Sequence, residues 1–305
     1  MRNTFVKHLV ERARVDERIF LITPDLGFSV LEPFAEEFPD RFLNVGIAEQ
    51  NAIGVAAGLA LSGKIVYVYS IIPFVTMRCF EQVRVDVAYM NTNVRLVGVG
   101  AGLSYGPAGA THHAIEDIAI MRALPNMTVC CPGDPVEVEK LVKQSFEFEG
   151  PIYFRLGKSG EENIHSQDKQ IEIGKAIKVT EGKDFTVITT SNTLGLAKQW
   201  VDEWRKQGKY ITLVSVHTIK PLDEEFIREM ITEKRPIITI EEHNIIGGLG
   251  SAIAEVIAES GIAISFKRIG IKDMYCHYVG SQNFLRDKLG ISLLNIPSME
   301  EKDEQ

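Results

Sequence analysis

Short apolar runs rich in β-branched residues alternate along the first half of the chain with longer segments of helical period. The runs predict β-strands at residues 19–23, 42–45, 65–70, 94–99, 127–131 and 152–156. The periodic segments predict helices at residues 4–15, 29–38, 49–61, 74–90, 115–123 and 135–148. Because strands and helices alternate, we expect a mostly parallel sheet with helices on both faces.

A polar stretch that is low in aromatic residues separates this half from the next, and we interpret residues 159–174 as a linker. A second series of alternating segments follows it. Its predicted strands are residues 186–190, 211–215, 237–241 and 265–269, and its predicted helices are residues 193–207, 223–232 and 251–259. The predicted fold class is therefore α/β, with two domains, residues 1–158 and 175–305, each built on a mostly parallel sheet flanked by helices.

Two stretches are almost free of charge, and neither has the pattern of a membrane span. Residues 51–77 contain Lys64 as their only charge, but Gly63 and Pro73 interrupt them. Residues 96–115 are uncharged, yet they contain five glycines, a proline and two histidines. We therefore expect both stretches to be buried in an α/β core, with no contact to a membrane.

The start of the chain and its cysteines bear on location. The first 18 residues carry eight charged side chains and lack the apolar run of a secretory signal. Cys79, Cys130, Cys131 and Cys276 have no metal-binding or redox spacing, so we expect free thiols in a reducing compartment. These features predict a cytoplasmic protein.

Composition narrows the class of partner. The chain has 305 residues, of which 45% are hydrophobic and 24% charged, and this supplies enough apolar material for two domain cores. Its 41 acidic and 33 basic residues give a net charge of −8, which argues against binding to nucleic acid. Small anionic substrates remain compatible, since one local arginine is enough to bind a phosphate.

Residues 42–63, FLNVGIAEQNAIGVAAGLALSG, carry the strongest functional signal. Residues 50–63 are uncharged and rich in Gly and Ala, so we expect a helix that is buried on all sides and approaches another backbone closely. One carboxylate, Glu49, stands directly before it. Glu49 is either a partly exposed residue of the first helical turn, favoured by the helix dipole, or a buried acid whose ionisation is tuned by its surroundings. The pattern alone leaves both interpretations open.

The segment VGIAEQNAIGVAAGLA, residues 45–60, closely resembles the one that carries the essential glutamate in transketolases and 1-deoxyxylulose-5-phosphate synthases. In those enzymes it belongs to the domain that binds the pyrimidine of thiamine diphosphate. The resemblance covers about residues 4 to 290, with further matching segments at residues 23–26, 125–127, 150–155, 217–223 and 242–250.

The domain that holds the diphosphate and its metal in this family is missing from the sequence. Its GDG signature is absent, and the Gly133–Asp134 pair is followed by Pro135 in what looks like a helix cap. The chain therefore resembles the C-terminal subunit of a split transketolase. The resemblance implies thiamine diphosphate as cofactor, Mg²⁺ or Ca²⁺ held by a separate N-terminal subunit, and a heterotetramer with two copies of each chain.

The resemblance implies a role for several residues at the cofactor. Glu49 matches the carboxyl group that hydrogen-bonds the aminopyrimidine and so promotes its reactive tautomer, which makes it a catalytic residue. Phe74 matches the stacking phenylalanine, although a helix could also carry it as a core aromatic. Ile71 and Met77 stand where the family has further aromatics, and Asp25 is placed near the cofactor or a neighbouring subunit.

Further matches concern the substrate. His112 matches a catalytic histidine that contacts substrate hydroxyls, and His113 stands where glutamine is usual. Arg155 matches an arginine near the substrate phosphate, with a surface ion pair as the alternative. The His pair is not expected to bind a metal, because adjacent side chains diverge. Pro107–Ala108 replaces an acidic pair that contacts a ketose hydroxyl, so the resemblance implies a non-standard or modified sugar.

These features together predict a transketolase-type transferase of aldehyde or ketone residues, which moves a two-carbon ketol unit between sugars when joined to its partner subunit. One alternative is 2-oxo acid chemistry, as in a pyruvate-decarboxylating carboligase or the E1 β subunit of a dehydrogenase, since pyruvate does not need the missing acidic pair. Another is a non-catalytic scaffold. Glu49→Ala separates the catalytic from the scaffold hypothesis, because only a catalytic chain loses turnover.

Overall fold

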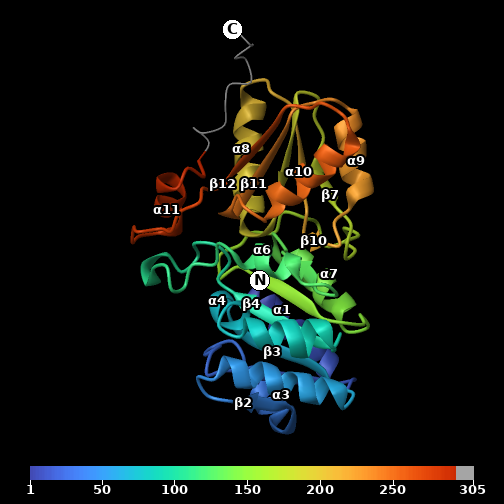
Figure 1. Ribbon diagram of the computed structural model, residues 1–305, viewed down its shortest axis with the longest axis vertical. Helices are drawn as coiled ribbons and strands as arrows, with labels where there is room; N and C mark the ends of the chain where they lie inside the picture. The colour runs from blue at the N-terminus through green and yellow to red at the C-terminus, as the bar shows by residue number, and fades with distance from the viewer. Residues whose placement is uncertain (293–305) are drawn as a thin grey trace.

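The computed structural model describes residues 1–292 and has the two predicted α/β units, one above the other along the long axis (Figure 1). The predicted fold class is confirmed, since each unit has a mostly parallel sheet flanked by helices. Residues 293–305, which end the predicted second domain, lie outside the described residues. No helix within residues 1–292 has the length and apolarity needed to cross a bilayer.

The first sheet has seven strands in the order β10-β5-β6-β4-β3-β1-β2. The strands of the first domain are parallel, with bounds β1 Ile19–Thr23, β2 Phe42–Asn44, β3 Ile65–Ile71, β4 Val94–Val99, β5 Thr128–Cys130 and β6 Ile152–Leu156. Every residue of β3, β4 and β6 is buried, because helices cover both faces; this explains their unbroken apolar runs.

The seventh strand, β10 (Thr218–Lys220), comes from the second half of the chain and pairs antiparallel with β5. The sequence analysis did not predict it. The second domain thus closes one edge of the first domain's sheet, and the two units share a backbone ladder.

The helices of the first domain lie on both faces of the sheet. Their bounds are α1 Arg2–Ala13, α2 Glu32–Glu37, α3 Glu49–Leu61, α4 Ile72–Thr76, α5 Phe80–Gln82, α6 Asp117–Ala123 and α7 Pro135–Ser145, with a π-helix η2 at Val83–Tyr89 and 3-10 turns η1 at Pro39–Arg41 and η3 at Gly106–Ala108. One apolar cluster joins α1 and α7 to one face, and another joins α3, α4 and η2 to the other.

The single helix predicted at residues 74–90 is wrong, because the structure divides it into α4, α5 and η2. Side chains also hydrogen-bond to backbone carbonyls in α4 and at the break. Thr76 Oγ1 donates to the carbonyl of Ile72 at 2.7 Å, and Cys79 Sγ donates to the carbonyl of Val75 at 3.0 Å. Such bonds offer the carbonyls an alternative to a continuing helix, and they free residues 77–79 to form a turn.

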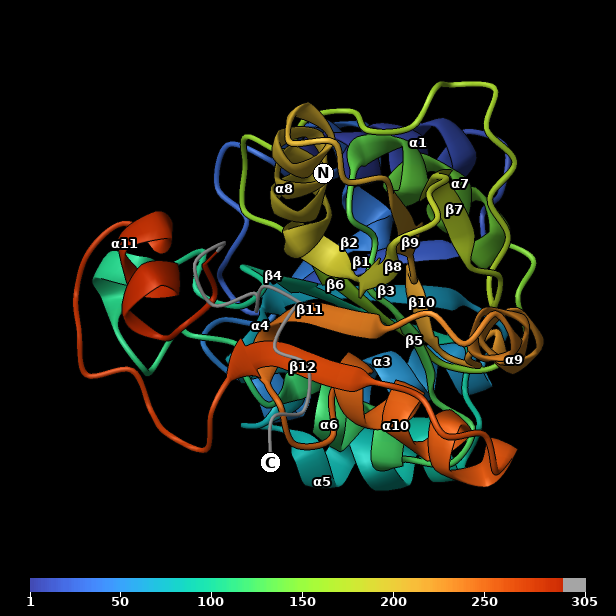
Figure 2. The same ribbon diagram turned by 90° about the horizontal axis from the view of Figure 1, so that it is seen from above.

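The second sheet has five strands in the order β12-β11-β8-β9-β7. Its strands are β7 Ile177–Thr180, β8 Phe185–Thr189, β9 Ile211–Ser215, β11 Ile237–Asn244 and β12 Phe266–Ile271, and β7 alone among them is antiparallel to its neighbour. Its helices are α8 Leu194–Lys206, α9 Glu224–Thr232, α10 Leu249–Ser260 and α11 Gln282–Lys288, with a 3-10 turn η4 at Ser191–Thr193. Figure 2 shows α8 and α10 on opposite sides of this sheet. β7 and α11 were not among the predicted elements.

The segment predicted as a linker, residues 159–174, lies against the first domain. The backbone N–H groups of Ile164 and His165 both donate to Asp134 Oδ2 at 2.8 Å. The ring of His165 is 2.8 Å from Glu137 Oε1, which also accepts from Ser215 Oγ of the second domain at 2.6 Å. The segment is therefore a fixed connection between the two domains.

Candidate active site

Glu49 is a buried acid. It is the first residue of α3, directly after the loop that follows β2, and its side chain is only 4% exposed. Its partner is Arg78, whose Nη1 donates to Glu49 Oε1 at 2.8 Å. Arg78 comes from the turn between α4 and α5, so the break in the predicted helix at residues 74–90 is what brings a cation to this carboxylate. Of the two interpretations of Glu49, the structure has the buried one.

Aromatic rings continue from this ion pair. The guanidinium carbon of Arg78 lies 4.0 Å from the centroid of the Phe74 ring. The Phe74 ring meets the ring of His112 edge-on at 5.2 Å, and Tyr105 meets His112 at 6.0 Å. Lys158 Nζ lies 4.8 Å from the centroid of Tyr105. An unbroken series of contacts thus runs from a buried carboxylate to an exposed amine.

The chain folds this way because β2, β3, β4 and β6 are parallel neighbours or near neighbours in one sheet. The carboxyl ends of parallel strands meet at one edge, where α/β proteins bind their ligands. The six residues of the series all follow such an end, namely Glu49 after β2, Phe74 and Arg78 after β3, Tyr105 and His112 after β4, and Lys158 after β6.

The remaining cofactor predictions concern residues around this series. Ile71 is buried at the end of β3, and Met77 is half-buried at the end of α4. Both are therefore three residues from Phe74 in the chain, one on each side. Asp25 is half-buried and accepts a hydrogen bond from Asn44 Nδ2 at 3.0 Å. Asn44 in turn accepts from the backbone N–H of Gly46 at 2.9 Å. Asp25 therefore holds the loop that leads into α3, and its contact with the cofactor stays a prediction.

The two histidines differ in their surroundings. His112 is half-buried, with Nδ1 2.9 Å from Thr111 Oγ1, and its ring faces Phe74 and Tyr105. His113 is 3% exposed, and its Nε2 lies 3.3 Å from the carbonyl of Gly106 in the same loop. Burial lowers the pKa of His113, so it stays neutral near pH 7. His112 therefore lies in the series of rings, and its contact with the substrate stays a prediction, whereas His113 lies inside the loop.

Arg155 is fully buried within β6. Its Nε donates to Asp117 Oδ2 at 2.8 Å, and its Nη2 donates to the carbonyls of Ala114 at 2.8 Å and Glu242 at 3.1 Å. A guanidinium engaged in this way ties the sheet to the second domain. The structure therefore does not support the prediction that Arg155 contacts an anionic substrate.

Two cations, Lys158 and Arg78, belong to this series but were not among the predicted site residues. Lys158 is exposed and lies just beyond β6. The sequence did contain a signal for it, because a residue past the end of a strand projects from the sheet edge, whereas a residue inside a central strand is buried. The role of Arg78 depends on the turn between α4 and α5, for which the periodic pattern gave no sign.

Two other polar clusters are explained by internal hydrogen bonds. Asp134, Glu137 and His165 have ligand-type atoms within 4.8 Å of one another, but both carboxylates already accept hydrogen bonds from the protein. At the start of α10, the buried Glu241 accepts from the N–H groups of Leu249 at 2.7 Å and Gly250 at 2.8 Å. The Glu241 carboxyl group thus occupies the place where this glycine turn could otherwise bind phosphate.

Both halves of the chain match transketolase families. Residues 1–160 match "Transketolase, pyrimidine binding domain", and residues 174–292 match "Transketolase, C-terminal domain". A subunit of the apulose-4-phosphate transketolase from Actinobacillus succinogenes is 40% identical over 261 residues, 86% of this chain and 84% of that protein. The 6-deoxy-6-sulfo-D-fructose transketolase subunit SqwH of Clostridium sp. is 36% identical over 297 residues, 97% of this chain and 92% of that protein.

A solved structure also matches over nearly the whole chain. It is described as a split gene transketolase in an inactive beta4 tetramer, and it superposes with a TM-score of 0.88 at 37% identity, covering 96% of this chain and 94% of that chain. The predicted resemblance is confirmed: the chain belongs to the transketolase family, and its pyrimidine-binding and C-terminal domains make up the C-terminal subunit of a split transketolase.

Proposed function

We propose that this chain supplies the pyrimidine-binding half of a thiamine diphosphate-dependent transketolase, which moves a two-carbon ketol unit between sugars. The observation that carries the proposal is the arrangement of Glu49, Arg78 and Phe74. A planar, N–H-bearing guanidinium donates to the buried carboxylate at 2.8 Å while it lies over the phenyl ring at 4.0 Å. An aminopyrimidine has the same two features, so the residues present fit this ring.

Each residue then has a defined task. Bound thiamine diphosphate supplies the nucleophilic carbon that attacks the sugar carbonyl. Glu49, which is buried, would share a proton with the pyrimidine N1′. Phe74 offers its face to the pyrimidine ring. Arg78 has to leave both groups before the ring binds.

The sugar is assigned to the other end of the series. His112 reaches toward sugar hydroxyls, and Lys158 binds an anionic end such as a phosphate or sulfonate. Pro107 and Ala108 are exposed on this loop and offer no side-chain acceptor to a ketose hydroxyl. A modified sugar suits such a site, and the relatives named for apulose-4-phosphate and 6-deoxy-6-sulfo-D-fructose support this class.

The surface of α3 supports a partner subunit. We expected this uncharged helix to be buried on all sides, but the structure leaves Asn51, Gly54, Gly58 and Leu61 exposed. Their spacing of three and four residues places them along one side of the helix. An exposed side made of small and apolar residues is suited to close approach of another chain. We assign it to the N-terminal subunit that carries the diphosphate and Mg²⁺ site, in a tetramer of two copies of each.

The test is a calorimetric titration of thiamine diphosphate with Mg²⁺ into the chain alone and into its complex with a candidate N-terminal subunit. We expect binding only in the complex, and there Glu49→Ala should abolish turnover while the two subunits still associate. Tight metal-dependent binding by the chain alone would contradict the split-site proposal.

The missing acceptor at Ala108 also suits a donor without that hydroxyl, such as pyruvate. Screening the assembled enzyme with ketose phosphates, sulfonated ketoses and pyruvate in parallel distinguishes the two functions. Turnover of pyruvate without turnover of any ketose would favour the 2-oxo acid alternative.

A further inference from the structure

A buried carboxylate of the second domain, that of Glu242 on β11, contacts the base of the loop that carries Tyr105 and His112. Glu242 is 1% exposed. Its Oε1 accepts from the backbone N–H of Leu103 at 2.5 Å and from Gln282 Nε2 of α11 at 2.7 Å. Asn192 Nδ2 donates to the same oxygen at 3.0 Å, and Arg286 Nε of α11 donates to Oε2.

Backbone packing makes this attachment close. Gly102 lies against the Glu242 carboxylate, with which a Cβ at that position would collide, and Gly102 has a φ of +60°. Gly106 lies in the same way against the carbonyl of Gly280. In both ribbon views, α11 and the loop after β4 lie side by side at one flank of the molecule (Figures 1 and 2).

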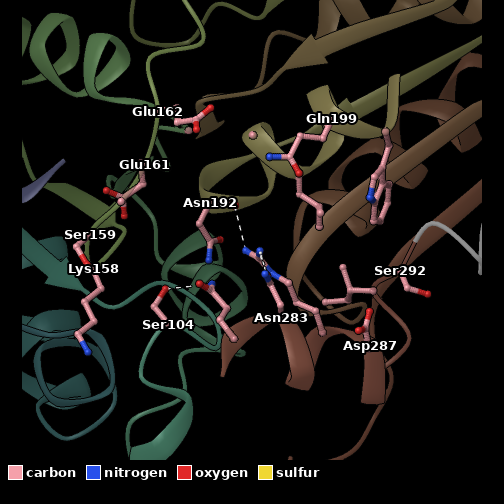
Figure 3. Close-up of a pocket in the computed structure, with 18 residues that line it drawn as sticks. Ser104, Lys158, Ser159, Glu161, Glu162, Asn192, Gln199, Asn283, Asp287 and Ser292 are labelled. Atoms are coloured by element: carbon pink, nitrogen blue, oxygen red, sulfur yellow. Dashed lines mark hydrogen bonds between the residues drawn. The ribbon is translucent and has the colours of Figure 1, made fainter. Parts of the chain in front are cut away.

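Side chains of the loop complete the contact. Leu103 is fully buried in an apolar cluster with Leu285 of α11 and Ile240 of β11. Ser104 Oγ accepts from Gln282 Nε2 at 3.3 Å. Ser104 and Asn192 border a cavity of about 760 Å³ at the domain boundary (Figure 3). Glu242 does not line this cavity and is buried.

The opposite side of the loop faces the candidate active site. Tyr105 follows Ser104 directly, and its ring contacts His112 and Lys158. The tip of the loop is exposed at residues 107, 108, 110 and 111, so the base of the loop has to determine where His112 lies. A bridge between Gly102 and Ala114, with Ala114 N donating to the carbonyl of Gly102 at 2.8 Å, closes that base where Gly102 packs against Glu242.

We propose that Glu242 is a positioning residue for the sugar substrate, through which the second domain fixes the loop that bears Tyr105 and His112. One carboxylate serves four donors, so neutralising it weakens four charge-assisted hydrogen bonds at once. The proposal rests on the proposed function for its effect on the sugar. Its effect on the loop is independent of cofactor and substrate.

Glu242→Gln tests the proposal by removing the negative charge with nearly unchanged side-chain volume. Arg286→Met tests it by removing the cation that donates to Glu242. Thr190→Val is the matched control, because the Thr190 hydroxyl donates across the same domain boundary, to the carbonyl of Cys131 at 3.3 Å, without touching the loop. Hydrogen exchange of residues 101–114 is measured in the full chain. The KM for 6-deoxy-6-sulfo-D-fructose and the Kd for thiamine diphosphate are measured in the assembled enzyme.

We expect Glu242→Gln and Arg286→Met each to speed hydrogen exchange of residues 101–114 at least tenfold. Each should also raise the KM for 6-deoxy-6-sulfo-D-fructose about tenfold. The cofactor Kd and the exchange of α3 should stay within twofold, and Thr190→Val should change none of these. Unchanged loop exchange in Glu242→Gln overturns the proposal, and so does a parallel loss of cofactor and sugar affinity, which marks a merely structural role. If the wild-type enzyme turns over no ketose, the proposed function fails, and the exchange experiment still decides whether Glu242 fixes the loop.

Discussion

Arg78→Met is the substitution that most directly probes how the site accepts its cofactor. In the structure Arg78 forms an ion pair with Glu49 and lies over Phe74, the two groups assigned to the pyrimidine. Methionine keeps an unbranched apolar stem but removes the planar cation. If Arg78 has to leave before the ring binds, the substitution removes a cost of binding.

The expected gain in cofactor affinity follows from how exposed the Arg78–Glu49 ion pair is. The Arg78 side chain is 45% exposed while Glu49 is 4% exposed, so solvent screens the ion pair to about 0.5–1 kcal/mol. The cation–π contact at this half-exposed position is worth about 0.5–1 kcal/mol. Releasing both therefore costs roughly 1–2 kcal/mol, which corresponds to about 5- to 30-fold in affinity.

Titration of thiamine diphosphate and Mg²⁺ into the assembled enzyme measures this gain. Arg84→Met is the matched control, because Arg84 is an exposed arginine six residues further on and the net charge changes equally. In the isolated chain, Arg78→Met should lower the melting temperature by about 2–4 °C, since the buried carboxylate loses its partner. Equal or weaker cofactor binding by Arg78→Met than by Arg84→Met would refute the reasoning.

Three further predictions concern the sugar, the partner and pH. Lys158→Met should raise the KM for an anionic ketose about tenfold and leave the KM for an uncharged ketose unchanged; equal effects on both would remove Lys158 from the anion site. Gly58→Gln should stabilise the isolated chain by about 0.5–1 kcal/mol, because Gly58 is an exposed helical glycine and a Cβ there would have no atom within 4 Å. The same substitution should weaken association with the N-terminal subunit at least tenfold, measured by sedimentation or calorimetry. Burial raises the pKa of Glu241 to about 7 from an ordinary 4.5, against the opposing N–H donors of Gly250 and Leu249. The folded state therefore holds this proton more tightly than the unfolded chain, and the stabilisation is lost as pH rises through 7. Between pH 5 and 8 the wild-type melting temperature should fall relative to that of Glu241→Gln, and parallel curves would contradict this.

Local pattern was sufficient for most of the secondary structure. The predicted bounds match those of strands β1, β4, β6 and β9 and of helix α3. In these segments the pattern of apolar residues follows directly from which faces of the element are buried. Local pattern was insufficient where side-chain hydrogen bonds or pairing with another domain determine the backbone conformation. In the turn after α4, the Cys79 side chain bonds back to the carbonyl of Val75, and β10 forms because a short segment of the second domain pairs with the edge of β5.

The same division applies to the candidate site. The sequence by itself determined the family, the two-domain α/β fold and the candidates Glu49, Phe74 and His112, because each follows from a contiguous motif or a single period. Only the tertiary structure decided that Arg155 is enclosed, that Arg78 covers Glu49, and that Glu242 accepts a hydrogen bond from a loop 139 residues earlier in the chain. These outcomes depend on which side chains are buried and which atoms meet across the sheet edge and the domain boundary. Such contacts join residues far apart in sequence, and no local pattern encodes them.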